Sequence, residues 1–137
     1  MLPLLRRHIG AESIVVDVGA HAGQFAKLFA GLASRGHVYA FEPGAYARSI
    51  LQPMVRLRGL KNVTVIAAGL SDAPGEATLF LPIKRRGNLG FGLGHLGPGN
   101  DGRAVRAEIV PLTTLDRFVA ETALTRLDFI KADIEGF

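Results

Sequence analysis

The chain has 137 residues, of which 48% are hydrophobic, and a formal net charge of +4 at pH 7. This length and composition favour one compact domain with a core of its own over a disordered chain. The sequence has no cysteine and no apolar run near the roughly 20 residues of a membrane span, so it excludes disulfides, thiolate metal sites and a transmembrane helix, and we expect no metal centre.

The basic charge is spread along the chain. It clusters only at Arg6-Arg7 and at Lys84-Arg85-Arg86, and no aromatic platform lies between these clusters. The pattern indicates a solvated basic surface rather than a nucleic-acid interface. The first residues place their charges after a short apolar patch, which is the wrong order for a secretory signal, so a cytoplasmic location is the default expectation.

The first half of the chain alternates between β-branched apolar runs and segments with helical spacing. The elements expected in chain order are a short helix or turn at 2–10, a strand at 13–18, a helix at 23–34, a strand at 37–41, a helix at 45–57 and a strand at 63–68. Gly36 is predicted to end the first long helix in the left-handed conformation, and Pro53 has to kink or divide the second. This β-α-β-α-β order with short connections predicts a parallel sheet.

The alternation of strands and helices ends at residues 71–75, which are predicted to form a turn from their composition. The later elements expected are a strand at 76–81, a half-exposed strand at 105–109, a short helix capped by Thr114 and a final strand at 127–137 that ends in acids and a glycine. The glycine-rich segment 87–102 lies among them, and we expect it to be a mobile lid, with His95 as a solvated loop residue.

A glycine turn, Asp17-Val18-Gly19-Ala20-His21-Ala22-Gly23, joins the first strand to the first long helix. Glycine lets a ligand approach the backbone, and the free N–H groups at the start of a helix favour an anionic group. His21 occupies the place of the second glycine of the G-x-G-x-x-G pattern, which disfavours a nicotinamide cofactor, and we interpret His21 as a turn residue. Any doubly wound fold needs a small-residue turn here, so this motif alone leaves ligand binding open.

Acidic residues follow two further strands. Glu42 comes directly after the strand at 37–41, where an acid accepts hydrogen bonds from ribose hydroxyls in nucleotide-binding α/β folds. Ser71-Asp72 follows the third strand at the same edge of the sheet. Asp72 either accepts from an adenine amino group or starts a turn, and both interpretations stay open. For Glu42, its spacing from the glycine turn favours ribose binding.

Charged residues alternate in the last strand, where Lys131, Asp133 and Glu135 share one face. Charges at the end of a buried strand are costly unless they are paired or functional, and ligands of open α/β sheets bind at this edge. We take these three as the candidate catalytic residues, with Asp133 as a general base toward a hydroxyl or as a partner of a cofactor amino group. The alternative is a Lys131–Glu135 ion pair that only neutralises the strand end.

Five segments follow one another in an order and spacing typical of one family. They are Asp17-Val18-Gly19-Ala20-His21-Ala22-Gly23, Tyr39-Ala40-Phe41-Glu42-Pro43, Asn62-Val63 leading to Gly69-Leu70-Ser71-Asp72, Thr114-Leu115-Asp116 and Phe129-Ile130-Lys131-Ala132-Asp133-Ile134-Glu135-Gly136. From about residue 13 to its end, the sequence thus resembles the FkbM family of S-adenosylmethionine-dependent methyltransferases. The resemblance implies a Rossmann-like class I methyltransferase core and S-adenosyl-L-methionine as cofactor.

The resemblance also implies roles for single residues. It places the turn from Gly19 to Gly23 at the methionine part of the cofactor and Glu42 on the ribose. The implied cofactor-binding residues are Asp17, Gly19, Ala20, His21, Gly23, Glu42, Pro43, Ser71 and Asp72. The implied reaction is O-methylation of a sugar or secondary metabolite, with a small-molecule or glycan hydroxyl as acceptor. The alternative is a non-catalytic module that binds a nucleoside or nucleic acid.

The sequence departs from the family pattern at two places. Gly69 stands where the family commonly has alanine, and the family continues with further strands where this sequence stops at Phe137. We therefore expect residues 1–137 to form a single S-adenosylmethionine-binding domain, incomplete at its carboxyl end. Its fold is an α/β core with a mainly parallel sheet, an inserted strand and glycine-rich loop before the last strand, and the later strands missing. The last strand is then an exposed edge that invites self-association.

Overall fold

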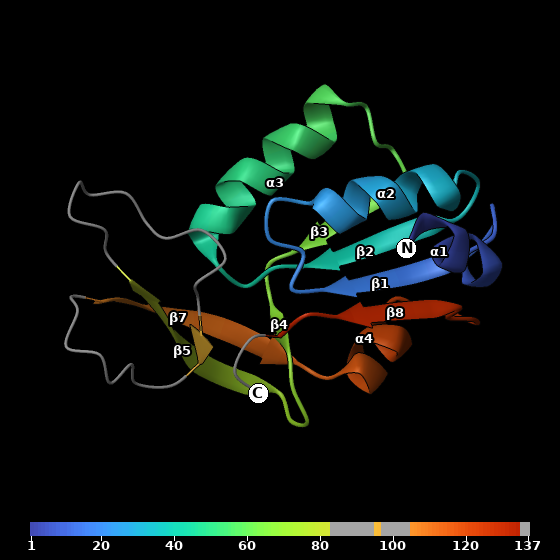
Figure 1. Cartoon of the computed structure of the whole chain (residues 1–137). Helices are drawn as coiled ribbons and strands as arrows, with labels where there is room; N and C mark the ends of the chain where they lie inside the picture. The colour runs from blue at the N-terminus through green and yellow to red at the C-terminus, as the bar shows by residue number, and fades with distance from the viewer. Residues whose placement is uncertain (83–94, 97–104, 135–137) are drawn as a thin grey trace.

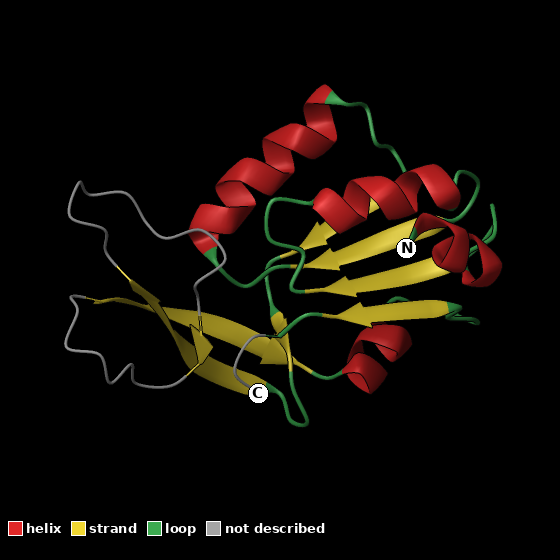
Figure 2. Ribbon diagram, in the orientation of Figure 1, coloured by secondary structure: helices red, strands yellow, loops and turns green. Residues whose placement is uncertain are grey.

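The computed structural model describes residues 1–82, 95–96 and 105–134, and its strands form two sheets. The first sheet contains β1 (Ile14–Val18), β2 (His37–Phe41), β3 (Val63–Ile66) and β8 (Phe129–Ala132). Its order is β3-β2-β1-β8, and each neighbouring pair is parallel (Figure 2). This arrangement confirms the predicted α/β fold with a mainly parallel, Rossmann-like sheet.

Helices cover both faces of the first sheet (Figure 1). One face carries α1 (Leu2–His8), α2 (Gln24–Leu32) and α3 (Ala45–Leu57), and the other carries α4 (Leu115–Glu121). Strand side chains alternate between these layers: Val15 and Val38 belong to the cluster with α2, whereas Val16 and Phe41 pack with Phe118 of α4. Because both faces are buried, the strands are nearly continuous apolar runs.

Two details of the helices bear on these predictions. Of the two alternatives for Pro53, a divided helix is excluded, since α3 runs unbroken from Ala45 to Leu57. Gly36 is not a left-handed cap: α2 ends at Leu32, and its C-cap is Ala33 at φ −90°. A Cβ at Gly36 would overlap the carbonyl oxygen of Ser13, so glycine is needed there for the close approach of two backbone segments.

The second sheet lies beyond the carboxyl ends of the first sheet's strands (Figure 1). It contains β4 (Gly69–Leu70), β5 (Gly75–Pro82), β6 (His95–Leu96) and β7 (Val105–Thr113) in the order β4-β7-β5-β6. The predicted strands at 76–81 and 105–109 pair with each other here as an antiparallel ribbon, and β7 continues past its predicted end to Thr113. The predicted strand at 63–68 is split, because the chain leaves the first sheet after Ile66 and joins β7 at Gly69.

The predicted lid lies mostly outside the described residues. Within segment 87–102 the structure describes only β6, where His95 pairs with Phe80 of β5, so His95 belongs to a strand rather than to a loop. The last strand is shorter than predicted, because β8 ends at Ala132. In the described part of the chain β1 is its one strand neighbour, so β8 is an edge of the first sheet. No helix among the described residues is long and apolar enough to cross a membrane.

Asn62 links the end of α2 to the start of β3. Its side-chain amide donates hydrogen bonds of 3.0 Å to the carbonyl oxygen of Ala30 and 2.9 Å to that of Ala33. The last carbonyls of a helix have no partner within it. We therefore expect Asn62→Ala to lower the free energy of unfolding by about 1–3 kcal/mol, measured by urea denaturation. A loss below about 0.5 kcal/mol, the range of a neutral surface substitution, would contradict this role.

Asp128 ties the start of β8 to β1. Its Oδ2 accepts from the backbone N–H of Ile14 at 2.7 Å, and both its oxygens accept from the Arg126 guanidinium. Arg126, and after it the Ile14 N–H, hold the pKa of Asp128 below its usual value.

A carboxyl whose pKa is lowered by folding adds stability above its unfolded pKa of about 3.9, and this gain is lost as the pH falls through the lower folded value. We expect the stability difference between the native chain and Asp128→Asn to be present at neutral pH and to shrink below about pH 4. Urea denaturation of both proteins across this range measures it, and a difference that does not change with pH rules the coupling out.

Candidate functional site at the carboxyl edge of the first sheet

A buried ion pair joins the ends of β1 and β8. The parallel register places Asp17 beside Lys131, and Lys131 Nζ lies 3.1 Å from Asp17 Oδ1. The same ammonium donates a hydrogen bond of 3.2 Å to the carbonyl oxygen of Gly19 and sits 4.9 Å from the centroid of the Phe25 ring. It is also 3.8 Å from Asp133 Oδ2. Lys131 therefore connects the strand ends, the glycine turn and the first turn of α2.

Asp17 is fully buried, with 0% of its surface exposed. Burial raises the pKa of Asp17, and the neighbouring Lys131 ammonium counteracts this by favouring the charged carboxylate. Asp17 Oδ2 accepts no hydrogen bond from any residue that the structure describes. The carboxylate thus depends on Lys131 for its compensation.

The glycine turn takes its shape from three left-handed residues: Gly19 at φ 73°, His21 at φ 49° and Gly23 at φ 87°. A Cβ at Gly19 would overlap the carbonyl oxygen of Asp133, which follows β8. A Cβ at Gly23 would overlap side chains of α3. Gly19 is therefore required by close packing against the backbone as well as by its conformation, and Gly23 by its left-handed conformation.

Glu42 is only 5% exposed and bridges two loops. Its Oε2 accepts from the backbone N–H of His21 at 2.8 Å, and its Oε1 accepts from that of Gly44 at 2.9 Å. The His21 ring nitrogen Nδ1 lies 3.7 Å from Oε2. Glu42 thus fixes the glycine turn to the turn after β2, a role that its position after a strand did not reveal.

Two residues that the sequence did not single out hold the turn after β2. Arg48 Nη1 donates to the carbonyl oxygens of Glu42 and Pro43. Glu108 of β7 accepts from the backbone N–H of Ala45 at the start of α3, at 3.1 Å and 3.3 Å. These bonds link the second sheet to the candidate site. From the sequence, Glu108 can be recognised only as one of the polar residues in a strand of alternating polarity.

The structure also places four other predicted residues: Asp133, Pro43, Ser71 and Asp72. Asp133 is open, with 51% of its side chain exposed, and half-buried Pro43 packs near Gly69. Ser71 and Asp72 lie after β4, where Ser71 donates to the carbonyl oxygen of Thr113 and to Asp72. Their described hydrogen bonds do not reach Glu42 or the glycine turn.

The structure therefore brings together six of the predicted residues at one edge. They are Asp17, Gly19, His21, Glu42, Lys131 and Asp133. Ala20 lies between Gly19 and His21 and is buried. Glu135 lies outside the described residues, so its predicted pairing with Lys131 stays a prediction, and the described carboxylate partners of Lys131 are Asp17 and Asp133. No group of three or more metal-ligating side chains occurs among the described residues.

A family model and a curated relative match this chain. The model of the methyltransferase FkbM domain matches residues 17–137. The AMB antimetabolite synthetase AmbE of Pseudomonas aeruginosa is 30% identical over 154 aligned residues, which cover 90% of this chain and 7% of AmbE. The chain therefore corresponds to a small part of that relative.

Two solved structures to which this chain is similar are described as methyltransferases. An rRNA methylase from Streptococcus thermophilus is 29% identical with a TM-score of 0.45, over 50% of this chain and 37% of that one. A SAM-dependent methyltransferase from Aquifex aeolicus is 24% identical with a TM-score of 0.44, over 53% of this chain and 42% of that one. Because both TM-scores are below 0.5, the fold assignment depends on the strand order and the family match.

Proposed function

This chain belongs to the FkbM methyltransferase family, and on that premise we propose that it transfers a methyl group to a hydroxyl oxygen of a sugar or secondary metabolite. The family uses S-adenosyl-L-methionine as its methyl donor. The observation that carries the proposal is that three of the family-like segments, those that contain Asp17, Glu42 and Lys131, meet at the carboxyl edge of the first sheet. There, Lys131 contacts both Asp17 and Gly19, and Glu42 holds His21.

The residues at this edge fit a ligand with a cationic amino-acid part. Asp133 offers an exposed carboxylate, and Asp17 Oδ2 is a buried acceptor without a donor. Each Glu42 oxygen accepts one backbone hydrogen bond and keeps a second lone pair for a ribose hydroxyl. We propose that the glycine turn holds the methionine part and that Glu42 orients the ribose. The bound cofactor supplies the electrophilic sulfonium methyl.

Methyl transfer places few chemical demands on the protein beyond position. The acceptor oxygen has to approach the methyl group in line, and water has to be excluded. Asp133 is the open carboxylate at this edge, so we propose it as the group that takes the hydroxyl proton. The alternative role for Asp133 is to bind the amino group of the cofactor, and the two roles predict different losses. If Asp133 is the base, replacing it lowers the turnover number. If Asp133 binds the cofactor, replacing it lowers the affinity for the cofactor.

Calorimetry with S-adenosylmethionine and, separately, with NAD tests the cofactor. We expect saturable binding of S-adenosylmethionine and none of NAD. Methyl transfer to a panel of sugars and hydroxylated metabolites, compared with a panel of amines, then tests the acceptor class. Binding without transfer to any acceptor would favour the non-catalytic module, and transfer to amines alone would exclude the proposed O-methylation.

Glu42 provides a direct test of the ribose assignment. We expect Glu42→Ala to weaken S-adenosylmethionine binding by about 1.5–3 kcal/mol, the usual worth of hydrogen bonds to a charged group. The same change leaves the N–H groups of His21 and Gly44 without their acceptor, which can destabilise the fold. The midpoint of thermal unfolding therefore has to be measured on the same samples. Unchanged affinity in a folded variant would remove Glu42 from the cofactor site.

A further inference from the structure

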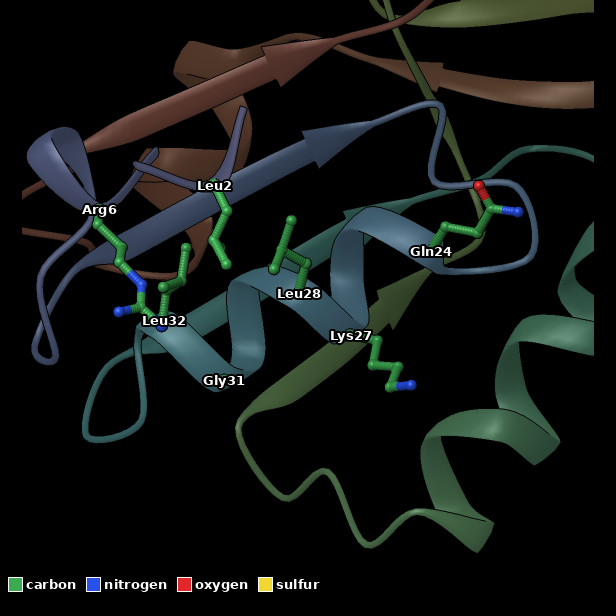
Figure 3. Close-up of a pocket in the computed structure, with 7 residues that line it drawn as sticks. All are labelled: Leu2, Arg6, Gln24, Lys27, Leu28, Gly31 and Leu32. Atoms are coloured by element: carbon green, nitrogen blue, oxygen red, sulfur yellow. The ribbon is translucent and has the colours of Figure 1, made fainter. Parts of the chain in front are cut away.

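A groove of about 470 Å³ lies on the outer surface of the first helical layer, and its lining residue Gln24 directly follows the glycine turn. Leu2 and Arg6 of α1 line it together with Gln24, Lys27, Leu28, Gly31 and Leu32 of α2. Figure 3 shows the leucines gathered between the two helices, with Arg6 on the α1 side and Lys27 on the other side of α2. The groove thus has an apolar floor flanked by two cations.

The two helices that form this groove carry only positive charge. The sequence of α1 contains Arg6, Arg7 and His8, that of α2 contains Lys27, and neither contains an acid. Among the residues that the structure describes, Arg6 and Lys27 have no ion pair. The nearby Arg35 differs, because Glu12 pairs with it at 3.3 Å. The charge at the groove is therefore available to an anionic partner.

Gly31 leaves part of the groove unfilled. It is exposed in the last turn of α2, next to the final residue Leu32, and a Cβ there would meet no atom within 4 Å. Glycine inside a helix is less stable than alanine by roughly 0.5–1 kcal/mol, and no left-handed φ or close contact requires it here. A side chain at Gly31 would project into the space beside Leu28 and Leu32.

We propose that this groove docks an acidic amphipathic helix of a partner protein. Leucine-sized side chains of such a helix fill the apolar floor, and its flanking carboxylates meet Arg6 and Lys27. The nine residues of α2 span about 13 Å at 1.5 Å per residue, which matches roughly two turns of a partner helix. The family match starts at Asp17, so α1 and its half of the groove lie outside the family domain.

The shape and chemistry of the groove favour a protein over other anionic partners. A membrane surface takes up protruding apolar side chains, whereas a recess needs a side chain that enters it. Nucleic acid would meet leucines rather than the aromatic rings that stack on bases. A second copy of this chain would bring the same cations face to face. A polypeptide with apolar and acidic side chains satisfies both the floor and the rim.

A designed peptide tests the proposal. The probe is a fluorescein-labelled helix of about 14 residues made of leucine and glutamate, with leucine at i, i+3, i+4 and i+7. Its twin has lysine in place of every glutamate. We expect saturable binding of the acidic peptide to the full chain by fluorescence anisotropy, weaker at high salt, and no binding of the twin.

Variants of the full chain locate the binding. We expect the double variant Arg6→Glu/Lys27→Glu to bind the acidic peptide about tenfold or more weakly than the native chain does. Gly31→Leu should abolish binding by filling the groove while keeping helicity by circular dichroism. Lys61→Glu reverses an exposed charge outside the groove and serves as the matched control, which should leave binding unchanged.

Four outcomes would overturn the proposal. They are no binding of the acidic peptide, equal binding of the lysine twin, binding unchanged in Gly31→Leu, and an equal loss in Lys61→Glu. Binding of anionic vesicles and of a short RNA is measured in parallel. If either one binds more tightly than the acidic peptide and loses binding in Gly31→Leu, the partner is a membrane or a nucleic acid rather than a protein.

Discussion

Replacing Lys131 with methionine should lower the free energy of unfolding by about 3–5 kcal/mol, the usual cost of removing one partner of a buried ion pair. Methionine keeps much of the apolar stem of lysine, so the main losses are the charge and its contact with the Phe25 ring. What remains is a fully buried Asp17 carboxylate beside the open Asp133, with no ammonium to compensate it.

The loss should depend on pH in a defined direction. Burial already raises the pKa of Asp17, and Lys131 is the strongest influence that lowers it. Without Lys131 the folded-state pKa rises further, so the folded chain takes up a proton before the unfolded chain does. The deficit of Lys131→Met should therefore be largest at neutral pH and shrink as the pH falls from the raised value toward the ordinary carboxyl pKa of about 3.9.

A double variant separates charge from packing. Asp17→Asn in the Lys131→Met background removes the uncompensated charge and should recover much of the lost stability, as apolar or neutral replacements of buried pairs often do. Urea denaturation of the two single variants and the double variant gives the coupling energy. A Lys131→Met chain within about 1 kcal/mol of the native chain, or a double variant no better than the single one, would show that Asp17 is not held by this pair.

The local patterns in the sequence are enough to predict most helices and strands of the first sheet, but not all of their ends. The strand and helix at 37–41 and 45–57 occur as predicted, because periodicity and flanking turn residues are local signals. Thr114 caps α4 as expected, accepting from the N–H of Arg117. The second sheet could not be predicted this way, since it depends on the pairing of β4 and β5 with β7 across a long sequence separation.

The candidate site could likewise be predicted from the sequence only in part. Residue types and strand ends place Asp17, Glu42 and Lys131 at one edge of the sheet. Their partners follow from register: Asp17 and Lys131 are neighbours only because β1 and β8 are parallel and aligned at those positions. The same holds for Glu42, whose acceptors are engaged by backbone N–H groups that carry no sequence signature. Glu108 of β7 likewise reaches the N–H of Ala45 at the start of α3 only when the second sheet is in place.

Gly19→Ala should be far more damaging than its single added methyl group suggests. At φ 73° an alanine pays about 1–2 kcal/mol for the left-handed conformation. Its Cβ would also overlap the carbonyl oxygen of Asp133, and relieving such a clash by backbone shifts typically costs another 1–3 kcal/mol or so. We expect a combined loss of about 2–5 kcal/mol in the free energy of unfolding. Because the shift moves Asp133 away from the glycine turn, S-adenosylmethionine binding should be lost as well.

Gly59 offers a matched control for the conformational part. It has φ 61°, and a Cβ there would meet nothing within 4 Å. Gly59→Ala should therefore show the strain of a left-handed alanine alone, about 1–2 kcal/mol, with normal cofactor affinity. Urea denaturation and calorimetry on both variants isolate the contribution of the contact between Gly19 and Asp133. If Gly19→Ala is no less stable than Gly59→Ala and binds S-adenosylmethionine like the native chain, the crossing of the glycine turn and the segment after β8 does not shape the cofactor site.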